Sequence, residues 1–195
     1  MSSKSEQLEA ITREVQLCEF CSLCEEAKNR VLGEGDPDSP VFFIGEAPGR
    51  REDETGRPFV GSAGRLLDIL LAKVKLARQK VFIGNIVKCR PPGNRRPGKE
   101  EVNSCSQHLE KQLSIIKPKV IAPMGNSAVD YIFEKYGIEK KVIGEAHGRP
   151  IEVMTCWGKV MIYPLYHPAA AIYNRELLSE LEIDMASLRR LLELL

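Results

Sequence analysis

The sequence predicts a three-layer α/β/α domain around a central, mainly parallel sheet of four strands. Short apolar runs of strand length alternate along the chain with stretches of helical periodicity, which is the pattern of successive strand–helix–strand units. The runs are almost continuously apolar, as is typical of strands covered on both faces. With 195 residues and no internal repeat or linker, we expect a single domain over residues 1–195.

This alternation places each element in turn. The expected strands are VFFIG (41–45), KVFIGNIV (80–87), KVIAPMG (119–125) and KVMIYPLYHP (159–168). The expected helices cover residues 62–76, 99–116, 127–136 and 176–195, with one more before the first cysteines and another beginning at Pro168. Glycine and proline in residues 142–153 favour a short hairpin there.

An unusually long segment, GEAPGRREDETGRPFVGSAG (45–64), joins the first strand to its helix. About 2–6 residues suffice for such a connection, and longer ones are commonly functional. Ligands of open parallel sheets bind outside the carboxyl ends of the strands. Two further segments follow strand ends, NIVKCRPPGNRRP (85–97) and YHPAAAIYN (166–174). We therefore expect all three to converge on one site.

Charge is informative through its distribution, because the net charge of +1 neither demands nor excludes a nucleic-acid partner. KCRPPGNRRPGK (88–99) holds five basic residues and no acid. A solvated surface is the simplest interpretation of such a run, but its place beside the expected site favours phosphate binding. No run of apolar residues is long enough to cross a membrane, and the polar N-terminus lacks a secretory signal. We expect an intracellular protein of the cytoplasm or nucleoid.

Six cysteines are present, and the first three, Cys18, Cys21 and Cys24, follow C-x2-C spacing. This spacing indicates a metal centre in an intracellular protein. Cys89 and Cys105 could complete four thiolates, which suit either tetrahedral zinc or an iron–sulfur cluster. A thioredoxin-like redox role is disfavoured because the motif does not lie at a strand end. Cys156 is expected to be a small buried hydrophobic residue.

The expected site offers groups for a flat heteroaromatic ligand. Neither a dinucleotide-binding glycine pattern nor a P-loop occurs, so NAD or ATP chemistry lacks its usual motifs. Phe59 could stack on a ring, and the Asn85 amide could read its edge because it both donates and accepts hydrogen bonds. Of the three histidines, His167 is the best placed for chemistry, at the end of the last strand.

Together, the three long segments and the cysteine spacing resemble the family 4 uracil-DNA glycosylases, the iron–sulfur enzymes common in archaea and thermophilic bacteria. The resemblance covers most of the chain, from the first cysteine to the helix after His167. It implies a DNA-repair enzyme that flips uracil out of DNA and hydrolyses its bond to deoxyribose, leaving an abasic site. It also implies a [4Fe–4S] cluster on Cys18, Cys21, Cys89 and Cys105.

The same resemblance assigns the uracil pocket. His167 would stabilise negative charge at the uracil O2 as a neutral donor, and Asn85 would select uracil over cytosine. Glu46 would position the attacking water or stabilise the sugar cation, because Ala47 stands where the best-known uracil-DNA glycosylases carry an aspartate. Glu52 would crowd the C5 position of the base and exclude thymine. The implied uracil-binding residues are Gly45, Glu46, Ala47, Glu52, Phe59, Asn85 and His167.

We expect the partner to be single- or double-stranded DNA containing uracil. The expected DNA contacts are Arg90, Arg95, Arg96, Lys99 and Tyr173. We also expect a monomer that meets other repair or replication proteins. Three alternatives stay open at this point: a glycosylase for other deaminated bases, an iron–sulfur protein that binds uracil-DNA without cleaving it, and a zinc protein that binds nucleotides.

Overall fold

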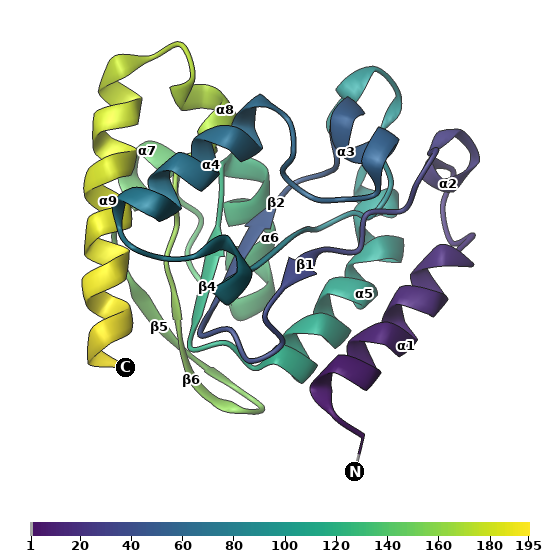
Figure 1. Cartoon of the computed structure of the whole chain (residues 1–195), viewed down its shortest axis with the longest axis horizontal. Coiled ribbons are helices and arrows are strands. Elements are labelled where there is room, and N and C mark those ends of the chain that lie inside the picture. The colour runs from purple at the N-terminus through teal and green to yellow at the C-terminus, as the bar shows by residue number, and fades with distance from the viewer. Residues whose placement is uncertain (1) are drawn as a thin grey trace.

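The chain is built around one six-stranded sheet with helices on both faces (Figure 1). The computed structural model describes residues 2–195. The strands lie in the order β1–β3–β2–β4–β6–β5. In chain order, they are β1 (Glu34–Gly35), β2 (Val41–Gly45), β3 (Phe82–Asn85), β4 (Val120–Pro123), β5 (Ile151–Thr155) and β6 (Gly158–Ile162).

The predicted parallel strands form the centre of this sheet, and two antiparallel edge strands are added to them. Strands β3, β2, β4 and β6 pair in parallel, whereas β1 and β5 pair antiparallel with β3 and β6. The prediction of four strands was therefore two short. Strand β1 has only two residues, and β5 alternates partly buried with exposed residues, so neither shows the apolar run of a central strand. The hairpin is the β5–β6 pair, later than the predicted 142–153.

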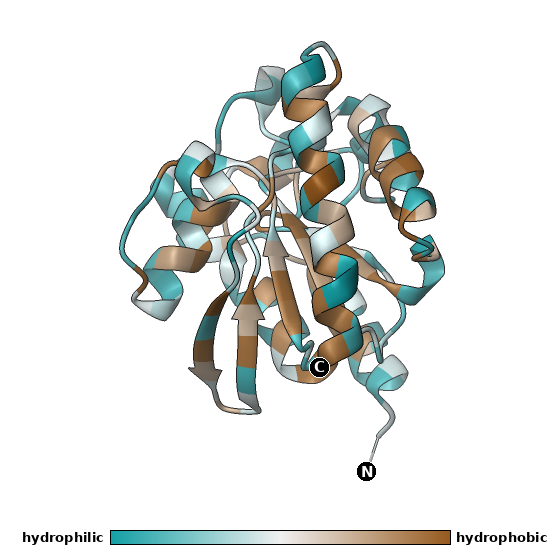
Figure 2. Cartoon of the chain, turned by 90° about the vertical axis from the view of Figure 1, so that its left-hand side faces the viewer, coloured by the Kyte–Doolittle hydropathy of each residue, from teal (hydrophilic) through white to brown (hydrophobic). Residues whose placement is uncertain are grey.

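The helices form two layers, and successive residues of β2 pack alternately against one layer and the other. Phe42 and Ile44 pack in one apolar cluster, together with residues of α1, α5 and α6. Val41 and Phe43 pack in a second cluster, with residues of α4, α8 and α9. Figure 2 shows the apolar colour along these strands. The helices concerned are α1 (Lys4–Gln16), α4 (Ser62–Lys73), α5 (Lys99–Ile116), α6 (Asn126–Tyr136), α8 (Pro168–Ala171) and α9 (Arg175–Leu194).

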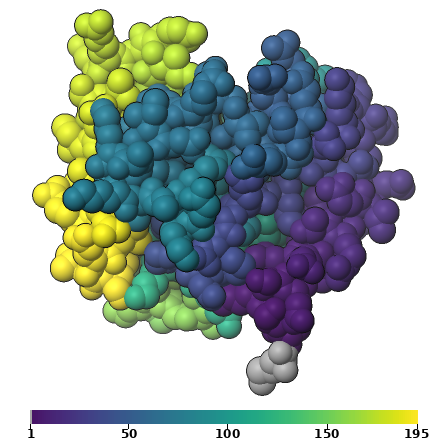
Figure 3. All heavy atoms as spheres, in the orientation of Figure 1, coloured from purple at the N-terminus to yellow at the C-terminus, as the bar shows by residue number. Residues whose placement is uncertain are grey.

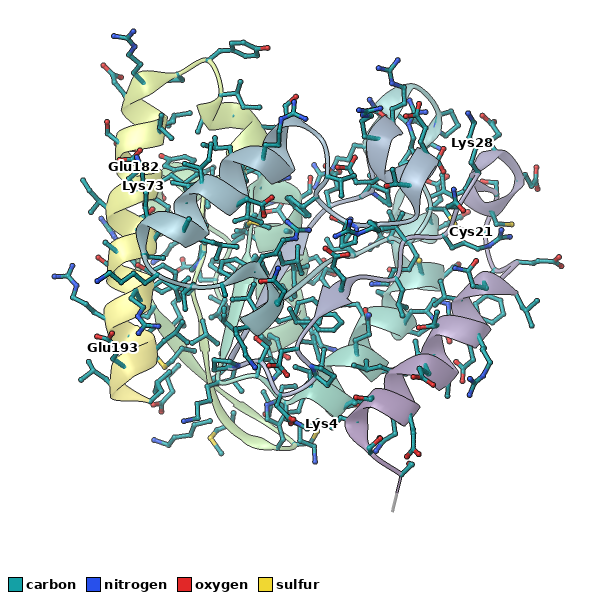
Figure 4. The ribbon with its side chains drawn as sticks, in the orientation of Figure 1. Lys4, Cys21, Lys28, Lys73, Glu182 and Glu193 are labelled. Atoms are coloured by element: carbon teal, nitrogen blue, oxygen red, sulfur yellow. The ribbon has the colours of Figure 1, made fainter. Side chains whose placement is uncertain are left out.

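The first and last long helices lie at opposite ends of the sheet. Helix α1 covers one side and α9 the other (Figures 1 and 3). Helix α9 is joined to α4 by an ion pair of 2.6 Å between Lys73 and Glu182 (Figure 4). None of the helices in residues 2–195 is both long and apolar enough to span a membrane.

Short helices occupy the connections between these elements. The long segment 45–64, for which no helix was expected, contains the helix α3 (Arg50–Thr55). The other short helices are α2 (Leu23–Glu26), η1 (Arg78–Lys80), η2 (Pro92–Asn94) and α7 (Ile143–Ala146). Helix α5 has the predicted bounds, whereas α4 ends at Lys73, and Lys75 adopts a left-handed conformation with φ 57°.

Candidate active site and cysteine centre

A cavity of about 540 Å³ opens at the carboxyl ends of the parallel strands, and all three predicted segments line it. Strand β2 points toward this edge, which is uppermost in Figure 1. The predicted residues that line the cavity are Glu46, Ala47, Glu52, Phe59, Asn85, Arg95 and His167. Several other residues that were not predicted also line the cavity, among them Asn94, Asn126 and Ser127. Their polar side chains come from loops and helix starts, where such residues are common.

Gly45 lies beneath the cavity, where the strand must leave room for two side chains. It is the cross-strand neighbour of Asn85 in the parallel β2–β3 pair. A Cβ atom at this position would lie 2.5 Å from Asn85 Oδ1 and 2.8 Å from the Phe59 ring. Only glycine therefore fits, because it lets both side chains approach the backbone.

The aromatic face of the cavity is Phe59, which is buried and adopts a left-handed conformation with φ 51°. Its ring centroid lies 5.6 Å from that of His167, and the two rings are tilted by 33°. Left-handed residues other than glycine, asparagine and aspartate are uncommon, and they often mark functional sites. The ring is thus held between the Gly45 backbone and the imidazole.

His167 presents a neutral imidazole with a defined tautomer. It is the N-cap of α8, and its Nδ1 accepts the Ala169 N–H at 3.1 Å. The proton of the neutral ring must therefore reside on Nε2. Burial lowers the pKa of His167 to about 4, although the Glu52 carboxylate opposes this shift. At neutral pH the side chain is a hydrogen-bond donor without charge.

The two carboxylates of the long segment differ in their hydrogen bonding. Glu52 Oε1 accepts the backbone N–H groups of Val60 and Gly61 at 2.9 and 2.8 Å, so it closes the loop onto the start of α4. Glu46 Oε1 is buried without a hydrogen bond among residues 2–195 and lies 3.8 Å from Arg96 Nε. Glu46 also lines a second cavity of about 580 Å³ beside α5 and α6. It therefore has capacity left to bind a water molecule.

The predicted DNA-contact residues differ in how their charge is already balanced. Arg95 forms a two-pronged ion pair with Glu101 at 2.6 and 2.8 Å, and Arg96 lies 3.4 Å from Asp130. In the described part of the chain, Arg90 and Lys99 have no carboxylate partner, and Arg90 Nε donates to Asn94 Oδ1. Of the four side chains, Arg90 and Lys99 thus have the charges that remain without a carboxylate partner in residues 2–195.

Tyr173, the remaining predicted contact, is 97% exposed between α8 and α9.

Five cysteines meet at a second place in the structure, away from the cavity at the strand ends. Cys18, Cys21, Cys24, Cys89 and Cys105 line one small cavity, and Figure 4 labels Cys21 between α1 and α2. The pKa of the Cys89 thiol is raised to about 12 and that of Cys105 to about 11, mainly by burial, with smaller contributions from the neighbouring Cys18 and Cys21. The thiols are therefore close enough to interact through their charges.

The surroundings of these thiols are basic. The Cys105 sulfur accepts the Lys88 backbone N–H at 3.2 Å, and His108 Nε2 lies 3.4 Å from the Cys18 sulfur. Lys88 is 1% exposed, with no carboxylate partner in residues 2–195, and Arg30 Nε is buried without a hydrogen bond there. Burying an uncompensated cation is costly, so an anionic group held by thiolates fits this cavity.

No three histidine, cysteine, aspartate or glutamate side chains in residues 2–195 have the arrangement of a site for a metal ion. The support for a metal centre is therefore the gathering of thiols and the basic groups around them.

The contacts of Lys88 and His108 with cysteine sulfurs could not be predicted from the sequence, because the residues that meet are far apart along the chain. Cys156 was predicted to be buried, which is wrong: it is exposed in the turn between β5 and β6.

Comparisons with known proteins agree on one family. The model of the uracil DNA glycosylase superfamily matches residues 32–188. A type-4 uracil-DNA glycosylase of Sulfurisphaera tokodaii is 43% identical over 187 residues, which cover 95% of this chain and 85% of that protein. That of Archaeoglobus fulgidus is 42% identical, covering 95% and 94%. That of Saccharolobus solfataricus is 40% identical, covering 96% and 87%.

Proposed function

The chain belongs to the uracil-DNA glycosylase superfamily and to its type-4 group, and from this premise we propose how its cavity excises uracil from DNA. The chain is a DNA-repair hydrolase that cleaves the bond between uracil and deoxyribose. The observation that carries the assignment of residues is the meeting of Phe59, Asn85 and His167 in one cavity at the sheet edge.

The base enters this cavity only after it has left the DNA stack, which costs a few kcal/mol. Stacking on the Phe59 ring recovers part of that cost. The Asn85 amide, whose Oδ1 approaches Gly45, donates to the uracil O4 and accepts from N3–H. Cytosine presents the opposite pattern at these positions, so the amide discriminates against it.

Negative charge develops on the departing base and positive charge on the sugar. His167 donates its Nε2–H to the uracil O2, because its Nδ1 is occupied by the Ala169 N–H. A fixed donor aimed at developing charge is among the largest contributions to catalysis. Glu46, with an oxygen free of protein hydrogen bonds, positions the attacking water beside the sugar cation. The Glu52 carboxylate, fixed by Val60 and Gly61, limits the space at C5 of the base.

Uracil-containing DNA is held through its phosphates by Arg90 and Lys99, and Arg95, which lines the cavity, Arg96 and Tyr173 make further contacts. Such contacts bind DNA independently of sequence and weaken with salt.

We further propose that Cys18, Cys21, Cys89 and Cys105 hold a [4Fe–4S] cluster, supported by the basic groups around these thiols. When bound, the cluster supplies a cross-link between three chain segments. The iron content and visible absorption of the purified protein test it.

A cleavage assay with a labelled oligonucleotide carrying one uracil tests the function. Alkali then breaks the strand at abasic sites, and oligonucleotides with cytosine or thymine at the same position are the controls. We expect breaks with uracil alone, and His167→Ala should lower the rate by about 100- to 1,000-fold. Binding of uracil-DNA without any break would contradict the proposal and leave a non-cleaving reader of uracil.

A further inference from the structure

The turn that carries Phe59 is fixed from several directions. Gly64 lies against the Phe59 backbone so closely that a Cβ atom there would be 1.7 Å from the Phe59 carbonyl oxygen. Glu52 holds the next two residues, Val60 and Gly61, by their N–H groups. A left-handed aromatic residue persists only where the surrounding structure imposes it. These contacts therefore impose the conformation that aims the ring.

Arg78, outside the cavity and on η1, supplies the remaining contacts. Its Nη2 donates to the Pro58 carbonyl at 2.7 Å, and its Nη1 donates to the Phe59 carbonyl at 3.3 Å. The same guanidinium is anchored by Glu34 at 2.9 and 3.0 Å and by Asp68 at 2.7 Å. Its side chain is only 17% exposed. The planar fork of an arginine can make such contacts in several directions at once, whereas a lysine cannot.

The neighbouring Arg57 shares one carboxylate partner with Arg78 but does not bind the turn of Pro58 and Phe59. Arg57 binds the same Glu34 carboxylate at 2.8 and 3.1 Å. Arg57 is largely exposed, and none of its hydrogen bonds within residues 2–195 reaches the carbonyls of Pro58 or Phe59. The two arginines thus share an acidic partner but not the turn.

We propose that Arg78 is a positioning residue for uracil excision: it holds the turn of Pro58 and Phe59 so that the Phe59 ring stays between Gly45 and His167. This inference rests on the proposed function, because it assigns the ring to the flipped base. Arg78 does not touch the base. It acts by keeping the stacking face in register with the imidazole that donates to O2.

Kinetics of Arg78→Ala on the uracil oligonucleotide test this role, with Arg57→Ala as the matched control. Misplacement of a reacting group by about 1 Å can cost about 100-fold in rate. We expect kcat of Arg78→Ala to fall by about 10- to 100-fold, with little change in KM, because the phosphate contacts lie elsewhere. Arg57→Ala should stay within about twofold of the unmodified protein, as for a surface change.

A double-mutant cycle distinguishes positioning from a general structural role. If Arg78 acts through the ring, Arg78→Ala should change kcat by less than about twofold in a Phe59→Ala background, because the two effects are not additive. Equal effects of Arg78→Ala with and without Phe59 would overturn the proposal, as would equal effects of Arg78→Ala and Arg57→Ala.

Should Arg78→Ala fail to fold, Arg78→Lys replaces it, since an ammonium still pairs with Glu34 or Asp68. We expect the same loss of kcat from Arg78→Lys, and unchanged kcat would overturn the proposal. If the unmodified protein leaves uracil-DNA intact, the proposed function fails instead. The two failures are therefore distinguishable.

Discussion

His167 carries a specific expectation at the scale of a single residue, because its hydrogen bond determines which nitrogen holds the proton. Burial lowers its pKa to about 4, below the ordinary value of 6.5. A lowered histidine pKa means that the folded protein favours the neutral form. The associated stability is present above pH 6.5 and is lost as the pH falls toward 4.

Activity should follow the neutral form of His167. We expect kcat/KM for uracil excision to lose the contribution of His167 as the pH falls through about 4, rather than near 6.5. Protonation of Nδ1 would remove its hydrogen bond with the Ala169 N–H. A pH profile of the unmodified protein measures this. His167→Gln, which has no titrating ring, should lack that transition. A histidine-dependent fall centred near pH 6.5 would contradict a buried neutral imidazole.

Asn85 makes the second prediction at this scale, which concerns base selection. Asn85→Asp keeps the size of the side chain but removes its donor, so it cannot pair with the uracil O4. We expect kcat/KM for uracil to fall by about 100-fold or more, with the uracil-to-cytosine preference reduced. Competition between the two oligonucleotides measures that ratio, with Asn85→Ala as control. An unchanged ratio in Asn85→Asp would show that the amide does not read the base.

Single residues were predictable where their position along the chain already indicated a role. Asn85 ends β3 and His167 follows β6, and the carboxyl edge of a parallel sheet brings such residues together. Arg78, Lys88 and His108 gave no comparable signal. Arg78 reaches Phe59 across 19 positions, and His108 meets Cys18 across 90. Contacts of this kind follow from the tertiary arrangement and leave no local pattern in the sequence.

At the scale of elements, the segment between β2 and α4 is an ordered structure closed by one carboxylate. Glu52→Ala would leave the N–H groups of Val60 and Gly61 without their acceptor. We expect a loss of about 1–3 kcal/mol in the free energy of unfolding, as for unsatisfied partly buried donors. Denaturant unfolding measures it.

Glu54→Ala, on the same helix, is the control for Glu52. Glu54 is exposed, and its ion pairs with Arg50 and Arg51 are long, at 3.9 and 3.7 Å. Removing the Glu54 carboxylate should lower the free energy of unfolding by less than about 0.5 kcal/mol. Equal costs for the two variants would mean that Glu52 does not close the loop.

Elements with a strong apolar period were the most predictable. The four parallel strands were located, and α5 has the predicted bounds. Helix α3 was missed because six residues, RREDET, are too few and too polar to show a period. The edge strands were missed because β1 has two residues and β5 is half exposed. Short or exposed elements depend on their neighbours, which the sequence does not display.

At the scale of the whole molecule, the α/β class predicted from the sequence is confirmed. Two routes link the cavity lined by cysteines to the proposed uracil site. Lys88, beside the thiols, donates from Nζ to the Asn85 carbonyl and to Gln112, both at 2.7 Å. On the other route, Asp53 of α3 accepts the Lys28 N–H at 2.9 Å, in the segment that follows the clustered cysteines. One route thus supports Asn85, which we propose to recognise the base, and the other supports the loop that carries Phe59.

This arrangement predicts that losing the centre weakens uracil excision even though no cysteine lines the cavity. Without the anionic group, Lys88 would be a buried cation lacking compensation, and three chain segments would lose their cross-link. We expect Cys89→Ser to lose iron and to lower the free energy of unfolding by about 2–4 kcal/mol, comparable to removal of a covalent cross-link. The rate of excision should fall more than the affinity for DNA, because Arg90 and Lys99 remain.

Cys156→Ser is the matched control, since this thiol is exposed in the β5–β6 turn and does not line the cysteine cavity. It should leave iron content, unfolding and excision unchanged. Iron content, denaturant unfolding and single-turnover cleavage of the uracil oligonucleotide are measured on both variants. If Cys89→Ser loses its iron but keeps both stability and the excision rate, the links through Lys88 and Asp53 do not couple the centre to the site. A loss confined to Cys89→Ser would instead show that the cluster maintains the geometry in which Asn85 and Phe59 receive the base.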